Sequence, residues 1–151
     1  MSPKQKDRIK KILKSVYFYS LTTSWKDMPQ TTIVLPGITE DWKILIISHK
    51  KRKKVQNIRN NPNVWLIADK TGLFRIPRVI YIKATAEICN LTTEKFNEFA
   101  SLHSWFSRRL IRRLARDEIK ESVLIEITPS KFTTVGIYGK VTETVSFRAP
   151  S

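Results

Sequence analysis

The feature of the sequence that most limits the fold is a series of short strand-type segments separated by short turns. Segments rich in aromatic and β-branched residues, bounded by Pro, Gly, Asn or Asp, favour strands. Strands are predicted at Val16–Ser24, Thr31–Pro36, Lys43–Ser48, Asn63–Asp69, Arg78–Asn90 and, on both sides of Pro129, within Ser122–Tyr138. The short turns at 25–30 and 37–42 predict an antiparallel meander for the first three. Six or more strands in 151 residues indicate a mainly β (α+β) fold, an antiparallel β-barrel with accessory helices.

Four segments have helical rather than strand-type spacing. In residues 3–16, apolar residues fall at Ile9, Ile12, Leu13 and Val16, after a predicted N-cap at Ser2. Further helices are predicted in 50–60, 93–103 and 104–119. Strands and helices do not alternate, and no Gly-rich phosphate loop is present. The doubly wound nucleotide-binding folds are therefore excluded.

The length suits one domain, 1–151, with a weakly specified tail at 138–151. No apolar run approaches the ~18 residues that span a bilayer, and the charged N-terminus does not resemble a secretory signal. The single cysteine, Cys89, excludes an internal disulfide framework, so we expect a cytoplasmic protein. Neither His49 nor His103 has the spacing of a metal site, and none is predicted.

The net charge of +15 and the pI near 10.2 make polyanions attractive partners. Five consecutive basic residues, Lys50–Lys54, lie at the start of a short helix. Such a run is compatible with a solvated helix face, a nucleic-acid patch or a local phosphate site. Charge alone does not choose among these.

Three segments carry a family resemblance: "FYSLTT" (Phe18–Thr23), "MPQTTIVLP" (Met28–Pro36) and "ILIIS…KKVQNIRNNPNVWLIAD" (Ile44–Asp69). In this order they resemble the pyridoxamine 5′-phosphate oxidase-like family, which has an FMN-binding split-barrel fold. The strands "RVIYIKATAEI" and "LIEITPSKFTTV" resemble later family strands. The chain departs from the pattern at Thr31-Thr32, where relatives often have arginine, and at Lys83, where glycine is common.

The resemblance implies that the chain binds FMN. The phosphate would be held by Ser48, Lys53 and Lys54, with Arg52 assisting, and the ring would lie against Thr22, Thr32 and Ile33. A helix N-terminus and lysine ammonium groups both suit a dianionic phosphate.

The resemblance further implies a homodimer with the cofactor at the subunit interface and a small-molecule substrate. The expected function is a flavin-dependent oxidoreductase of unknown substrate, or a non-catalytic flavin binder. No catalytic side chain is predicted, because flavin itself carries the redox chemistry. The substrate-binding C-terminal segment of pyridoxamine phosphate oxidase proper is not found in 136–151, so vitamin B6 synthesis is not predicted.

A second basic feature is the amphipathic helix 105–116, with Arg108, Arg112 and Arg116 on one side and Arg109 and Arg113 beside them. Its simplest interpretation is a solvated helix docked on the barrel. Alternatives are a deazaflavin with an oligoglutamate tail, which would make the chain a deazaflavin-dependent reductase, or nucleic acid bound by a non-enzymatic basic barrel. A membrane-surface helix is a weaker option, because the flanks are strongly charged, and no membrane partner is expected.

Overall fold

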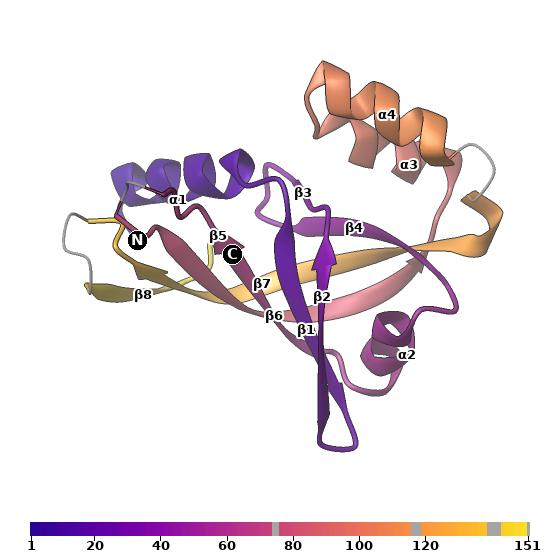
Figure 1. Cartoon of the computed structure of the whole chain (residues 1–151), viewed down its shortest axis with the longest axis horizontal. Coiled ribbons are helices and arrows are strands. Elements are labelled where there is room, and N and C mark those ends of the chain that lie inside the picture. The colour runs from indigo at the N-terminus through magenta and orange to yellow at the C-terminus, as the bar shows by residue number, and fades with distance from the viewer. Residues whose placement is uncertain (74–75, 116–118, 139–142, 151) are drawn as a thin grey trace.

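The computed structural model describes residues 1–73, 76–115, 119–138 and 143–150. In these residues an eight-stranded antiparallel sheet is accompanied by four α-helices (Figure 1). The helices are α1 (Pro3–Ser15), α2 (Lys53–Asn60), α3 (Thr93–Ser101) and α4 (Trp105–Ala115), with a short 3₁₀ helix at Ile119–Glu121. The strands are β1 (Tyr19–Trp25), β2 (Met28–Val34), β3 (Gly37–Ile38), β4 (Ile44–His49), β5 (Asn63–Asp69), β6 (Val79–Asn90), β7 (Ser122–Val135) and β8 (Thr144–Arg148). The predicted mainly β (α+β) class is confirmed.

The strand order of the sheet is β2-β1-β5-β6-β7-β4-β3, and β8 also pairs with β7. The prediction of a meander is correct for β1 and β2 but wrong for the third strand, because β4 pairs with β7. The two-residue strand β3 lies in a segment predicted as a turn. It forms a hairpin with β4 and leads the chain away from β2. A short connection limits the distance between two consecutive strands, but it does not determine which strand each of them pairs with.

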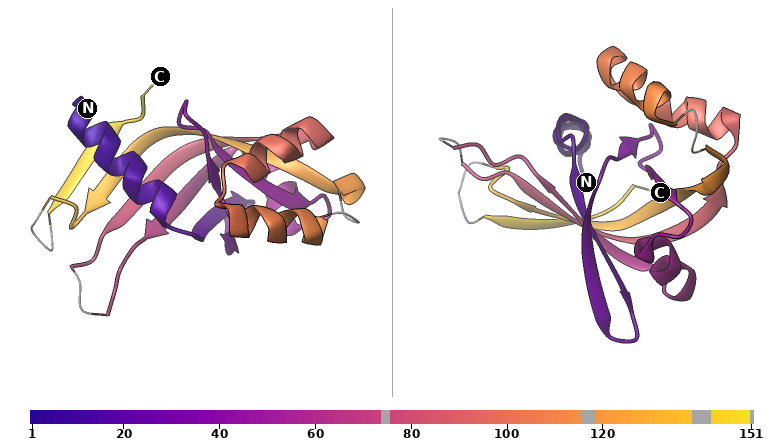
Figure 2. Two further views of the ribbon diagram at one scale, coloured as in Figure 1. Left: turned by 90° about the horizontal axis from the view of Figure 1, so that it is seen from above. Right: turned by 45° about the vertical axis from the view of Figure 1, so that its right-hand side comes forward.

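The β1–β2 hairpin projects from the rest of the sheet (Figure 2). Its turn consists of only Lys26 and Asp27, with φ angles of 52° and 58°. Two residues with positive φ match the right-handed twist of the flanking strands. The predicted turn at 25–30 is therefore too long, because pairing continues to Trp25 and Met28.

Strand β7 is one continuous element and not two strands separated at Pro129. Between β6 and β7 the register shifts at Lys83 and Ala84, so that Ser130 is the extra residue of a bulge. A proline is tolerated at a bulge because its missing N–H breaks no ladder hydrogen bond there. The other edge of β7 pairs first with β4 and then with β8, a strand that the sequence does not predict in the tail.

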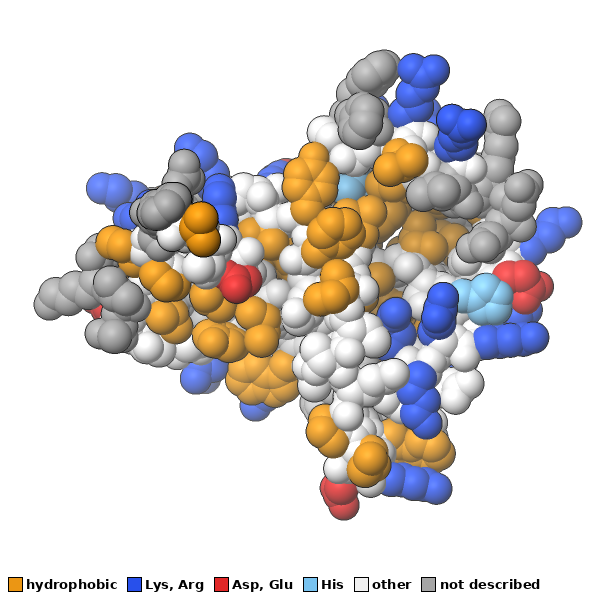
Figure 3. Space-filling view, in the orientation of Figure 1, with side chains coloured by type: hydrophobic (Ala, Val, Ile, Leu, Met, Phe, Trp, Pro, Cys, Tyr) orange, Lys and Arg blue, Asp and Glu red, His pale blue; other side chains and the backbone are white. Residues whose placement is uncertain are grey.

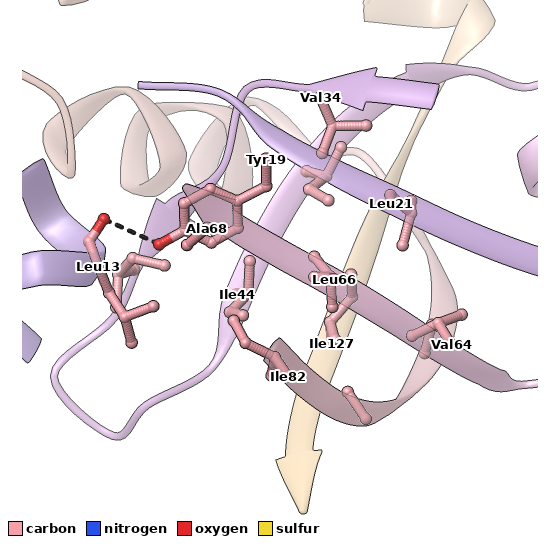
Figure 4. Packing of buried hydrophobic residues seen from close by; sticks show 14 of the residues in the cluster. Leu13, Tyr19, Leu21, Val34, Ile44, Val64, Leu66, Ala68, Ile82 and Ile127 are labelled. Atoms are coloured by element: carbon pink, nitrogen blue, oxygen red, sulfur yellow. Dashed lines mark hydrogen bonds between the residues drawn. The ribbon is translucent and has the colours of Figure 1, made fainter. Parts of the chain in front are cut away.

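Helix α1 packs on the sheet and helps close the core. Ser2 caps it in a capping box with Gln5, as the sequence predicts for the cap residue. Ile9 and Leu13 are buried in the main apolar cluster. The hydroxyl of Tyr19 donates to the Leu13 carbonyl at 2.8 Å, inside this cluster (Figure 4). This bond fixes the chain where α1 ends and β1 begins.

Helices α3 and α4 lie on the same side of the sheet as α1 (Figure 2). They approach β3 closely at Gly37, where an added Cβ would lie 2.9 Å from Leu102 Cδ1. Beneath them, Leu45, Phe99 and Leu124 form a second, smaller apolar cluster. In the described part of the chain, no helix is long and apolar enough to cross a membrane.

Candidate functional site

The segment from Ser48 to Lys54 joins β4 to α2 and brings together the residues predicted to bind phosphate. Ser48 is buried near the end of β4. Arg52 is the N-cap residue of α2 and has an extended backbone conformation. Its backbone N–H donates to the His49 carbonyl at 3.1 Å. None of the described side chains caps this helix. The first amides of an uncapped helix point outward without partners, which makes this end of α2 suited to an anion.

Lys53 and Lys54 stand in the first turn of α2. Lys54 is half-buried, and this burial, with a smaller contribution from Arg52, lowers its pKa. Lys53 is exposed, with Nζ 5.9 Å from the centre of the Trp25 ring. Among the described residues neither lysine forms an ion pair, whereas Lys50 pairs with Glu121 at 2.9 Å. The basic residues of this run therefore differ in whether they are paired. Lys50 is neutralised by a carboxylate, whereas Lys53 and Lys54 remain available to an anion.

Among the described residues, buried polar atoms without hydrogen-bond partners lie on the β1–β2 hairpin and on the facing side of α2. Asn57 Nδ2 donates to Thr23 Oγ1 at 3.0 Å, but Asn57 Oδ1 accepts no hydrogen bond. On β2, Gln30 Oε1 and Thr32 Oγ1 are also buried and unpaired. Buried polar groups are nearly always satisfied, so three neighbouring exceptions suggest a missing polar partner.

A cavity of about 470 Å³ lies between the hairpin and α2. Trp25, Gln30, Lys53 and Asn57 are among its lining residues. It therefore combines two of the unpaired polar side chains with one of the free lysines. A group with an anionic end and several hydroxyl or amide hydrogens fits this donor and acceptor set.

The predicted ring contacts Thr22, Thr32 and Ile33 do not share one face of the hairpin. Thr32 lies opposite Leu21, on the inner face. Thr22 lies opposite Thr31, with the two hydroxyls 2.8 Å apart, and belongs to the outer face together with Ile33. Successive side chains of a strand point to opposite faces, so a flat ring on one side of the hairpin reaches only one of these sets.

The outer face of the sheet exposes apolar side chains. Ile33, Trp65 and Tyr81 retain 66%, 46% and 37% of their accessible surface. Strand pairing places Trp65 opposite Thr22, and Tyr81 opposite Ile67 on the neighbouring strand. These strands are adjacent, so the exposed residues belong to one continuous surface of β2, β1, β5 and β6.

A family model described as pyridoxamine 5′-phosphate oxidase matches residues 5–136 of the chain. The chain belongs to this family. The resemblance inferred from the sequence motifs is therefore confirmed, and so is the split-barrel form of the sheet. No curated protein matches the chain.

Solved structures agree on this fold. General Stress Protein 26 from Bacillus anthracis str. Sterne is 23% identical, with a TM-score of 0.71 over 95% of this chain and 98% of that chain. A FAD-binding protein from Mesorhizobium loti is 15% identical, with a TM-score of 0.66 over 89% and 92% of the two chains. A heme-binding protein from Mycobacterium smegmatis is 13% identical, with a TM-score of 0.74 over 99% of this chain and 60% of that chain. At these identities the similarities show the fold.

Within the pyridoxamine 5′-phosphate oxidase fold of this chain, two polar residues that line the cavity beside α2 are not among the site residues predicted from the sequence. Asn57 is buried on α2 between Val55 and Ile58, the apolar positions of a short polar helix. A polar residue at a position where the helical spacing predicts burial can be recognised in the sequence as a candidate site residue. Gln30 lies two residues before Thr32 on β2, so their side chains share one face of the strand. The sequence does not show that this face meets α2.

The remaining candidate residues have other partners or positions. His103 places both ring nitrogens near carbonyl oxygens, with Nδ1 2.9 Å from Phe99 and Nε2 3.0 Å from Pro36. In the described residues no group of three or more His, Cys, Asp or Glu side chains could hold a metal ion. On the basic helix α4, Arg112 and Arg113 are exposed, and Arg116 lies outside the described residues. Lys and Arg side chains outnumber acidic ones on the face shown in Figure 3.

Proposed function

We propose that the chain binds FMN and acts as a flavin-dependent oxidoreductase on a small-molecule substrate. The observation that carries this proposal is the uncapped start of α2, where, among the described residues, Lys53 and Lys54 form no ion pair and nearby buried polar atoms lack partners. When bound, FMN supplies the redox chemistry. The chain itself then needs to bind, orient and enclose the cofactor and substrate.

The phosphate would lie at the N-terminus of α2. The first amides of this helix and the half-buried ammonium of Lys54 would be its main donors, helped by Lys53, Arg52 and the Ser48 hydroxyl. Each charge-assisted hydrogen bond of this kind contributes about 1.5–3 kcal/mol. Lys54 is half-buried, which lowers its pKa, and its attraction to an anion is screened less by water than that of an exposed lysine.

The polar part of the cofactor beyond the phosphate would lie along the inner face of the hairpin. There the unpaired oxygens of Gln30 and Asn57 can accept hydrogen bonds, and the Thr32 hydroxyl can donate or accept. Thr22 and Ile33, on the outer face, would instead contact a cofactor held by a second copy of the chain. In a homodimer, each predicted ring contact would therefore touch a cofactor, either the chain's own or that of the second copy.

The outer sheet face would form the homodimer interface. Ile33, Trp65 and Tyr81 are exposed there on adjacent strands and form a continuous apolar surface. Such a surface, unlike single exposed apolar residues, indicates an interaction site. Aromatic residues are enriched at interfaces, and a two-fold axis through one face is the commonest arrangement of a homo-oligomer. A mass of twice 17.6 kDa in solution is the expected result.

The proposal is tested by the visible spectrum of the purified chain after excess FMN has been added and desalted away. A stoichiometric retained flavin band is expected. If a deazaflavin is retained and FMN is not, the deazaflavin-dependent alternative takes its place. If neither is retained, the chain does not act as proposed.

Binding of nucleic acid would give a different salt dependence. A protein that neutralises 6–10 phosphates of a duplex loses roughly 10³–10⁵ in affinity between 50 and 200 mM salt. Binding through one partly enclosed phosphate should depend less on salt, because partly buried charges are screened less. Tight nucleic-acid binding with the steep dependence, and no FMN binding, would favour the non-enzymatic basic barrel.

A further inference from the structure

A second cavity lies between the end of α1, the segment that follows β2, and the junction of α3 and α4. Its volume is about 360 Å³, within the ~300–1,000 Å³ range of small-molecule sites. It is separate from the cavity beside α2, because the two cavities share none of their described lining residues. Its lining combines apolar side chains such as Leu102 and Ile38 with several hydroxyl groups.

The charges around this cavity are already paired. Lys14 is the cationic residue among the described lining residues, and its Nζ lies 2.6 Å from Glu40. The same carboxylate also binds Lys10, and these two lysines lower the pKa of Glu40 to about 2. The ring nitrogens of His103 both face carbonyl oxygens. The described lining therefore offers no unengaged cation to a phosphate or carboxylate.

Hydroxyl groups are what the cavity offers instead. Ser104 Oγ and Ser107 Oγ lie 3.0 Å apart, and both hydroxyls hydrogen-bond to Tyr17. These two bonds lower the pKa of the Tyr17 phenol. When one serine donates to the other and the second serine donates to the phenolic oxygen, the phenol proton is left to donate elsewhere. Tyr17 lines the cavity beside both serines, so this cluster suits a ligand oxygen that accepts a hydrogen bond.

The cavity begins where the proposed flavin region ends. Leu35 and Pro36 line it and directly follow Val34, the last residue of β2. Ile33, one of the predicted ring contacts, precedes Leu35 by two residues, about 7 Å along an extended chain. In the proposed homodimer Ile33 contacts the flavin held by the second copy, so a molecule bound in this cavity would reach that copy's flavin.

We propose that this cavity binds an uncharged substrate through a carbonyl oxygen that accepts a hydrogen bond from Tyr17, with the apolar part of the substrate against Leu102 and Ile38. The substrate class is thus a neutral carbonyl compound and not a phosphate ester. That the ligand is a substrate depends on the proposed flavin function. Binding of the ligand does not depend on it.

Equilibrium dialysis with 1-tetralone, a neutral bicyclic ketone, tests the proposal, with 1-naphthyl phosphate as its anionic counterpart. Both are measured with the chain alone and with FMN present. The ketone should bind and the phosphate ester should bind more weakly. Loss of one neutral hydrogen bond in Tyr17→Phe should weaken ketone binding about 5-fold. Ser107→Phe should fill the cavity and abolish binding.

Phe18→Leu is the matched control, because Phe18 is as exposed as its neighbour Tyr17 but does not line the cavity. It should leave ketone binding unchanged. Equal or tighter binding of the phosphate ester, or ketone binding that ignores Tyr17→Phe, would overturn the proposal. A separate FMN titration distinguishes the two failures. FMN binding without ketone binding would refute the substrate class only, whereas Tyr17-dependent ketone binding without FMN binding would refute the flavin function only.

Discussion

Removing the two free lysines of α2 is the perturbation whose effect on cofactor binding can be worked out most directly. The variant is Lys53→Ala with Lys54→Ala. Lys54 is half-buried, so its charge-assisted bond to a phosphate is worth about 1.5–3 kcal/mol. Lys53 is exposed and screened, so its contribution is about 0.2–1 kcal/mol. Together they predict a loss of about 2–4 kcal/mol, which is roughly a 30- to 900-fold rise in the Kd for FMN.

The assay is quenching of flavin fluorescence during titration at constant ionic strength. The matched control is Lys51→Ala with Arg59→Ala, which removes the same net charge from two exposed positions at the two ends of the same segment. This control should change the Kd less than about 5-fold, because both side chains are solvated. Equal losses in the two variants would mean that only net charge matters, and would refute the assignment of the phosphate to the first turn of α2.

Three further predictions concern stability. Tyr19→Phe removes the buried bond to the Leu13 carbonyl and should lower the free energy of unfolding by about 1 kcal/mol, measured by urea denaturation. Gly136→Ala should cost at least about 2 kcal/mol in the same assay, because φ is +70° and the new Cβ would lie 1.9 Å from the Pro77 carbonyl oxygen. Glu40, whose folded-state pKa is lowered from 4.5 to about 2 by its two lysine partners, stabilises the fold above pH 4.5 and loses this effect as the pH falls toward 2. The difference in Tm between the wild type and Glu40→Gln should therefore shrink over that range, and a constant difference would contradict this pairing.

The elements could be predicted from sequence where local patterns are strong. The strand Asn63–Asp69 has the predicted bounds, because Asn61-Pro62 ends the preceding helix and a polar turn follows. The N-terminal helix has its predicted cap at Ser2. By contrast, β4 pairs with β7, which is distant in sequence, and β8 is held by its pairing with β7, the strand before it. Nothing in the local pattern of either strand specifies that choice.

The candidate site divides in the same way. Ser48, Arg52, Lys53 and Lys54 lie within one strand-to-helix connection, so a motif in the sequence is enough to bring them together. The contacts along the hairpin depend on tertiary structure. The predicted pair Thr22 and Thr32 splits between two faces because the register places Thr32 opposite Leu21.

Gln30 on β2 and Asn57 on α2 complete the polar lining between the hairpin and the helix, but they meet only through packing of the helix on the hairpin. Their unpaired oxygens become visible only once burial is known. Sequence motifs therefore identify the residues proposed to bind the phosphate, and the structure was needed for the rest of the candidate site.

The measurement that tests the central claim most directly is a comparison of FMN and riboflavin binding to the wild-type chain. The two flavins differ only in the phosphate group, so their affinity ratio isolates the role of α2. Two or more charge-assisted bonds together with the helix N-terminus predict that FMN binds at least about 100-fold more tightly. Equal affinities, or no binding of either flavin, would contradict a phosphate site at Ser48–Lys54.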